Sequence, residues 1–212
     1  MASAENEGEK EHVITSNIFI PRYNGPSVNE MTDEQKSIRD SILASRKGTG
    51  LSGPFGPWIA IPSIAQPSQQ LGKACRYDTS LKFHESELII LLTGAKTKAH
   101  AEFDIHVGEA IKSGISMKII NAIPRDDEFS IQAVHKKLLP LFQDSPRDIA
   151  IIKFVTELLC TYGKISDETY ETTKAALGGK DSVLVEITSI VGYYTYVSYT
   201  LNVFNIPYKP KK

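Results

Sequence analysis

Cysteine is scarce in this sequence, and its thiols form no recognisable site. Cys75 and Cys160 are the two cysteines among 212 residues, and they stand far apart in no metal-ligand spacing. A disulfide framework is therefore not expected, and a reducing, cytoplasmic location is predicted. Each thiol is predicted to be a small apolar core residue rather than a nucleophile.

An excess of charge of either sign is also lacking. The chain has 24 basic and 25 acidic residues, which gives a net charge of −1. This balance predicts neither a nucleic-acid-binding groove nor a basic membrane-binding face. The acidic residues 1–12 contain no apolar segment of the kind that a secretory signal needs. A balanced charge is consistent with an enzyme that acts on a small molecule, and many other proteins share it.

Uninterrupted apolar segments long enough to cross a membrane are absent too. The longest candidate, residues 182–204, contains Glu186 and many side chains with hydroxyl groups. Its composition favours a strand, but its apolar residues recur at steps of three and four over a length that suits a helix. We therefore predict a buried helix here and no membrane partner.

Helix start signals recur along the rest of the chain. Thr32 begins a capping box with Gln35, and Ser116, Ser145 and Ser166 precede apolar segments of helical period. Convincing strand patterns are lacking, so we predict an all-α bundle of eight or nine helices. The expected helices span about residues 32–48, 63–79, 87–95, 99–112, 117–123, 134–141, 146–162, 167–177 and 182–204.

The length suits one domain with a substantial core. We assign a flexible, partly extended segment to residues 1–31, a single all-α domain to 32–207 and a basic tail to 208–212. A loop rich in glycine and proline at 48–58 breaks the helical pattern early in the domain. Such loops are surface connections with functional potential.

Residues 87–115 predict two helices in a hairpin. The run from Leu88 to Leu92 is apolar on every side, which places its helix inside the protein or at a subunit interface. Glu87 stands beside this run, where a carboxylate must be paired or have its pKa raised. On the second helix, Glu102 and His106 lie one turn apart on the same face.

Two motifs in this hairpin carry a family resemblance. The pattern E-L-x-x-L-L begins at Glu87, and E-F-x-x-H-x-x-x-A-x-x-x-G-I-S begins at Glu102. Together they resemble the core of the carboxymuconolactone decarboxylase family, and the flanking segments extend the similarity over about residues 50–207. Two positions depart from the family pattern, since Phe103 stands where tryptophan is common and Ser86 where arginine is frequent.

The resemblance implies an all-α fold assembled as a homo-oligomer, a trimer or a multiple of it, with a dimer as the alternative. It also implies decarboxylation of a small carboxylated lactone without a cofactor. Isomerisation or lactone opening on a related substrate would use the same residues. A second branch of this superfamily, the alkyl hydroperoxidase D type, needs a Cys-x-x-Cys pair, and the corresponding positions here are Ala99 and Glu102.

The candidate catalytic residues are His106, Glu102 and Glu87, because two carboxylates and an imidazole are suited to general acid–base chemistry. Histidine both donates and accepts protons near pH 7. No metal is expected, since no pair of histidines stands one helical turn apart. The candidate substrate-binding residues are Phe55, Trp58, His100, Phe103 and Tyr194.

Each assignment has a purely structural alternative. His106 could be a buried structural histidine, Glu102 a helix-surface partner, and Glu109 a competing partner one turn beyond the imidazole. Trp58 and Phe55 could simply cover the core. At the level of function, the alternatives are a thiol-dependent, peroxidase-like redox protein and a non-catalytic oligomeric binding module on the same fold.

Overall fold

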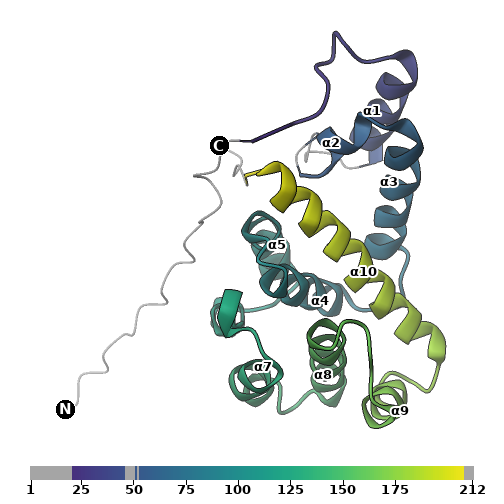
Figure 1. Ribbon diagram of the computed structural model, residues 1–212. Helices are drawn as coiled ribbons and strands as arrows, with labels where there is room; N and C mark the ends of the chain where they lie inside the picture. Colours follow the sequence, from purple (N-terminus) through teal and green to yellow (C-terminus); the bar gives the residue numbers. More distant parts are fainter. Residues whose placement is uncertain (1–20, 46–50, 52, 208–212) are drawn as a thin grey trace.

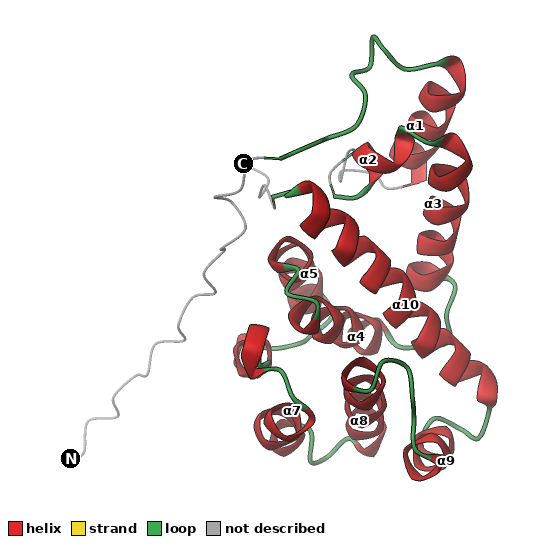
Figure 2. Cartoon of the chain, viewed as in Figure 1, coloured by secondary structure: helices red, strands yellow, loops and turns green. Residues whose placement is uncertain are grey.

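The fold is that of a computed structural model, which describes residues 21–45, 51 and 53–207. Within these residues the chain forms ten α-helices and two short 3-10 helices and contains no strand (Figures 1 and 2). The predicted all-α fold class is confirmed. The predicted basic tail at 208–212 lies outside the described residues, as does most of the predicted flexible segment.

Short connections join the helices in chain order. The α-helices are α1 Asp33–Ser45, α2 Phe55–Ile59, α3 Pro62–Tyr77, α4 Phe83–Lys96, α5 His100–Lys112, α6 Met117–Ala122, α7 Ile131–Leu138, α8 Pro146–Cys160, α9 Asp167–Ala176 and α10 Asp181–Phe204, and the 3-10 helices are η2 Asp126–Glu128 and η3 Leu139–Leu141.

Hydroxyl side chains begin several helices where the sequence predicts them. The Gln35 N–H donates to Thr32 Oγ1 at 3.3 Å, and the Thr32 N–H donates to the Gln35 side-chain oxygen at 2.9 Å. Ser116, Ser145 and Ser166 each accept a hydrogen bond from a backbone N–H in the first turn of α6, α8 and α9. These bonds satisfy donors that a helix leaves unpaired at its start.

Helix α4 begins earlier than predicted, at Phe83 rather than at Glu87. The apolar run marks the middle of this helix, and its polar first turn carries no apolar period that would reveal it. Glu85 is therefore the first-turn carboxylate, and it accepts a hydrogen bond from the backbone N–H of Lys82 at 2.8 Å. Glu87 lies two residues further along the helix, where the interior surrounds it.

The predicted loop at 48–58 contains a short helix, α2, whose five residues are all buried. Five residues are too few to show a helical period in the sequence. Residues 48–50 and 52 of this loop lie outside the described residues.

Helix α4 is the centre of the molecule and packs against α5, α8 and α10 (Figure 1). The five residues from Leu88 to Leu92 have no exposed surface. A helix that is apolar on all sides is stable only when other elements surround it. The chain's own helices do so here, and of the two locations predicted for this run the interior is the one observed.

Helix α10 runs diagonally between the group α1–α3 and the hairpin of α4 and α5 (Figure 1). The helix predicted for residues 182–204 is confirmed, and its stripe of spacing three and four faces the core. Among the described residues, none of the helices combines the length and the apolar character that membrane crossing requires.

The segment before α1 fastens α2 to the end of α10. The backbone N–H of Arg22 donates to the carbonyl oxygen of Phe204 at 2.8 Å. The chain then passes so close to α2 that a Cβ on Gly56 would lie 2.1 Å from the carbonyl oxygen of Asn24. Only glycine permits this contact. It fixes the position of the neighbouring Phe55.

The central position of α4 has a measurable consequence for stability. We expect Ile90→Ala to lower the free energy of unfolding by about 2–5 kcal/mol, because it leaves a cavity where no solvent can enter. Ile111→Ala on α5 is the control, since that side chain is 48% exposed and its truncation should change stability by about 0.5 kcal/mol or less. Urea denaturation at one protein concentration measures both, and equal losses would contradict the central role of α4.

Candidate functional site

His106 lies between two carboxylates, one from each helix of the α4–α5 hairpin. Its Nδ1 is 2.7 Å from Glu87 Oε2, and its Nε2 is 3.1 Å from Glu102 Oε1. All three side chains are buried. Glu102 precedes His106 by one turn of α5, whereas Glu87 reaches the ring from α4 because the tight turn between the two helices turns their inner faces together. The structure thus brings the three candidate catalytic residues into one network.

The imidazole in this network is charged. Burial lowers the pKa of His106, since it removes water from the ring, but Glu87 and Glu102 outweigh this effect through their charges and hydrogen bonds and raise the pKa to about 9. At neutral pH both ring nitrogens therefore carry hydrogen and donate to the two carboxylates. The His106 ring thus holds a transferable proton between two acceptor carboxylates.

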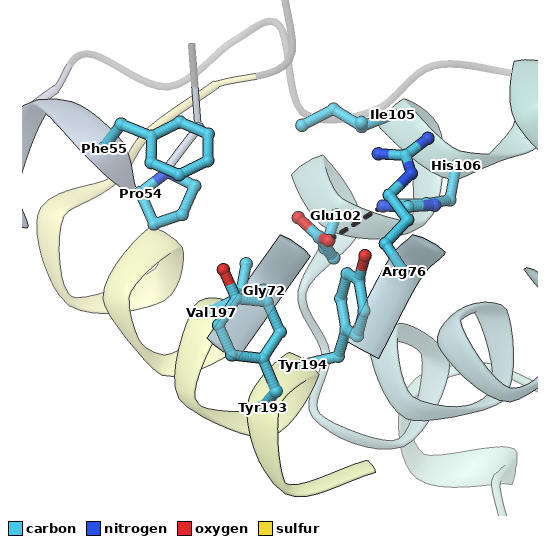
Figure 3. A pocket seen from close by; sticks show the side chains of 11 residues that line it. Pro54, Phe55, Gly72, Arg76, Glu102, Ile105, His106, Tyr193, Tyr194 and Val197 are labelled. Atoms are coloured by element: carbon cyan, nitrogen blue, oxygen red, sulfur yellow. Dashed lines mark ion pairs between the residues drawn. The ribbon is translucent and has the colours of Figure 1, made fainter. Parts of the chain in front are cut away.

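A small cavity opens beside the network (Figure 3). Its volume is about 80 Å³, several times the roughly 10–15 Å³ that one water molecule needs. It therefore has room for a ligand of a few non-hydrogen atoms. The lining residues come from α2 with its preceding loop and from α3, α5 and α10: Gly53, Pro54, Phe55, Gly72, Arg76, Glu102, Ile105, His106, Tyr193, Tyr194 and Val197.

The cavity has a polar side and an apolar side. Figure 3 shows Glu102, His106 and Arg76 gathered together, with Pro54 and Phe55 across the opening from them. A few convergent polar groups against an apolar wall are typical of small-molecule sites. Glu87 is not among the lining residues, so Glu102 forms the end of the network that a ligand would meet.

Two adjacent tyrosines of α10 complete the floor. The Tyr194 ring meets the His106 ring edge-on, with centroids 5.2 Å apart. Burial raises the pKa of Tyr194 well above its usual value, so its hydroxyl stays a donor at neutral pH. The Tyr193 ring fills the space that Gly72 leaves free, since a Cβ on Gly72 would lie 2.1 Å from the Tyr193 hydroxyl oxygen.

Arg76 on α3 is the functional candidate that the sequence prediction missed. Its guanidinium lines the cavity and lies 3.4 Å from Glu109 and 3.9 Å from Glu87. A signal was present, because Gln69, Gly72 and Arg76 recur at helical steps on the buried face of α3. A cation on the buried face of an amphipathic helix must be paired with an anion or a hydrogen-bond acceptor.

Of the predicted substrate-binding residues, Phe55 and Tyr194 line the cavity and the other three do not. Trp58 lies behind Phe55, where it stacks on Tyr196 and its Nε1–H donates to Thr200 Oγ1 at 3.0 Å. The Trp58 side chain therefore supports the wall of the cavity from outside.

Phe103 and His100 point elsewhere. Phe103 is one residue beyond Glu102, which turns it by about 100° around the helix, and its ring lies under the Arg125 guanidinium, whose Cζ is 5.1 Å from the ring centroid. There it is 1% exposed. His100 Nε2 lies 3.3 Å from Asp126 Oδ1 and lines a separate hollow at the start of α5.

The two cysteines lie away from the cavity. Neither is among its lining residues, and both are free thiols. Cys75 is buried, and burial raises its pKa, which disfavours the reactive thiolate. The predicted role of Cys75 as a core residue is confirmed, and Cys160 packs against the edge of the core.

One cluster in the described part of the chain has the residue types and spacing of metal ligands: His84, Glu85 and Asp148. His84 Nε2 is 3.0 Å from Asp148 Oδ1. Both oxygens of Glu85 are bound by Arg147, at 2.5 and 3.1 Å. A guanidinium in this position repels a cation, so we interpret the cluster as an ion-pair network that joins α4 to α8.

The charged imidazole should make stability depend on pH. The folded pKa of His106 is about 9, above the unfolded value of about 6.5. Its contribution is therefore fully present below pH 6.5 and is lost as the pH rises toward 9, on the order of 3 kcal/mol in all. Denaturant unfolding across this window should show the loss in wild type and a flatter profile in His106→Gln. His135→Gln is the control, because burial lowers the pKa of His135. A wild-type profile as flat as that of His106→Gln would contradict the charged state.

Comparison with known proteins identifies the fold. A crystal structure described as an alkylhydroperoxidase AhpD core, an uncharacterized peroxidase-related protein from Ralstonia eutropha, superposes on this chain with a TM-score of 0.68. The match covers 95% of each chain at 16% sequence identity. No protein-family model and no curated protein sequence matches the chain. The chain therefore has the alkylhydroperoxidase D-like fold that the sequence predicts, and an identity this low speaks for the fold alone.

Proposed function

We propose that this protein is an enzyme that transfers protons to and from carbon in a small oxygenated carboxylate or lactone, without a cofactor. The observation that carries the proposal is the buried network of Glu87, His106 and Glu102, which ends at a cavity of small-molecule size. Decarboxylation, isomerisation and lactone opening all need a group that supplies or takes up a proton beside the bound ligand.

The proton would leave the network through Glu102. His106 donates from Nε2 to Glu102 Oε1, and Glu102 lines the cavity, so a proton can pass from the ring to this carboxylate and on to a ligand carbon. Glu87 holds the ring by its other nitrogen and balances the charge. His106 is thus the main proton-transfer residue, Glu102 the relay and Glu87 the positioning residue.

The ligand must stabilise the electron pair that bond cleavage leaves on it until the carbon is protonated. In a decarboxylation the carbon–carboxylate bond breaks, CO₂ leaves, and the electron pair moves into a conjugated carbonyl to give an enolate. Protonation of carbon then completes the reaction. The Tyr194 hydroxyl is the available donor for the developing oxyanion, and Phe55 helps to keep water from the carbanion.

The structural neighbour is described as a peroxidase-related protein, which favours a second candidate, a peroxidase-like redox function. Thiol chemistry would have to use Cys75 or Cys160, which do not line the cavity. Incubation with a hydroperoxide and a dithiol tests this candidate. Turnover that disappears in Cys75→Ser or Cys160→Ser would replace the acid–base proposal.

We also propose that the chain assembles into a homo-oligomer, a trimer or a multiple of it, with a dimer as the alternative. Exposed apolar side chains support the proposal: Tyr162 is 98% exposed, and Val185, Tyr199 and Val203 on α10 are more than half exposed. Apolar surface of this kind favours burial between subunits. Sedimentation equilibrium at micromolar concentration should give a multiple of 23.4 kDa, and a monomer throughout would contradict it.

The reaction class can be tested before a substrate is known. Small unsaturated carboxylates and lactones are incubated with the protein in D₂O and followed by proton NMR, which detects CO₂ loss, double-bond migration, ring opening and hydrogen exchange. We expect at least one of these for a member of the panel. Once it is found, His106→Gln should lower kcat by about 10²-fold or more.

The controls separate acid–base from thiol chemistry. Cys75→Ser and Cys160→Ser should leave the rate nearly unchanged, and Glu102→Gln should lower it because the relay is lost. Full activity in His106→Gln would show that another group moves the proton. A panel without any reaction would favour the non-catalytic binding module.

A further inference from the structure

We propose that Arg76 is the receptor for a carboxylate on the ligand, so that the substrate is a small monocarboxylate rather than a neutral lactone. The inference rests on the proposed function, and it adds the chemical group that the cavity recognises. Three observations carry it: the contacts of the guanidinium, its place on the cavity wall and the competing carboxylate of Glu109. The chemistry of an anchored carboxylate then restricts the reaction.

The guanidinium of Arg76 is paired loosely. Its Nη2 lies 3.4 Å from Glu109 Oε2 and 3.9 Å from Glu87 Oε1. These distances exceed the 2.7–2.9 Å of a charge-assisted hydrogen bond. Glu87 Oε1 is itself buried without a hydrogen-bond partner. The forked donors of the guanidinium are therefore held between carboxylates without being saturated by either.

The cavity wall directs these donors to a ligand. Arg76 lines the cavity together with Glu102 and His106, and 21% of its side-chain surface is exposed (Figure 3). The Tyr193 ring, which fills the space beside Gly72 one turn earlier on α3, lines the same cavity. A planar guanidinium on the wall of a small cavity matches a carboxylate with two parallel hydrogen bonds.

Glu109 is the carboxylate that an incoming ligand would replace. Its side chain is 31% exposed, and it has a second cationic partner in Lys112 at 2.7 Å. The pKa of Glu109 is lowered, first by its hydrogen bond from Lys112. Glu109 can therefore release Arg76 without becoming an unpaired charge.

An anchored carboxylate also restricts the reaction. An ion pair with Arg76 stabilises the carboxylate relative to CO₂, and enzymes accelerate only steps whose transition states they bind more tightly than the ground state. The anchored group therefore stays on the ligand. Within the proposed function this favours isomerisation or lactone opening over loss of the anchored carboxylate, with the proton moving between Glu102 and a ligand carbon.

Binding of charged and neutral probes tests the inference without turnover. Acetate, crotonate and 2-furoate, each with its primary amide, are titrated into the protein by calorimetry or ligand-observed NMR. Wild type should bind at least one carboxylate about tenfold or more tightly than its amide. Arg76→Gln should lose this preference, with an affinity for the carboxylate about 10- to 100-fold lower.

Matched variants keep a folding defect from imitating the result. Lys73→Gln removes one exposed positive charge from the same helix and should leave the affinity within about twofold of wild type. Glu109→Gln removes the competitor and should tighten carboxylate binding about two- to fivefold. A general structural defect cannot move the Arg76 and Glu109 variants in opposite directions. Arg76→Lys keeps the charge but loses the fork, and we expect an intermediate affinity.

Three outcomes would overturn the inference: no preference for carboxylate over amide in wild type, an unchanged affinity in Arg76→Gln, or no binding of any probe. Failure of the proposed function is distinguished from these outcomes by the turnover of the His106→Gln variant. Full turnover in His106→Gln, together with a carboxylate preference that depends on Arg76, would refute the catalytic role of His106 and leave the receptor in place.

Discussion

A charged imidazole in the interior is the constraint on which the rest of this structure depends. Burying an unpaired charge costs several kcal/mol, so His106 can remain an imidazolium only with partners that are equally buried. Glu87 and Glu102 supply them, one on each ring nitrogen. Two carboxylates around one cation leave an excess of negative charge, and Arg76 on α3 offsets it from across the network. Removal of His106 would leave both buried carboxylates without their shared partner.

The fold serves this network by fixing three helices around it. Helix α4 must be fully enclosed because its central run is apolar on all sides, and none of that run is exposed. The enclosure also buries Glu87 at the depth of the imidazole. Helix α10 brings Tyr193 and Tyr194 against the cavity, and the glycine at position 72 lets α3 approach them. The same close packing that stabilises the core therefore holds the groups that line the cavity in place, and Glu102 lies where a proton from His106 can reach a ligand.

The sequence predicts the fold well because its signals are local. Capping residues and the period of residues 182–204 specify helices whatever their neighbours are. The spacing of Glu102 and His106 likewise predicts their contact, since one turn of helix separates them. Contacts between distant segments are harder to predict: Arg76 reaches the site because α3 packs against α10, and no local pattern encodes that packing. Phe103 is predicted to bind the substrate because it is next to Glu102 in the sequence. Adjacent residues lie on different faces of a helix, and Phe103 does not line the cavity.

The protonation state of His106 is the most direct test of this account. Nitrogen-15 NMR of the histidine side chains reports the state of each ring nitrogen, and His106→Gln assigns the signal. We expect both ring nitrogens of His106 to carry hydrogen at pH 7 and the ring to titrate with a pKa of about 9. In Glu87→Gln the pKa should fall, because one of the charges that raise it is removed. A neutral ring with a single tautomer at pH 7, and a pKa at or below about 6.5, would contradict the stored proton from which the proposed chemistry follows.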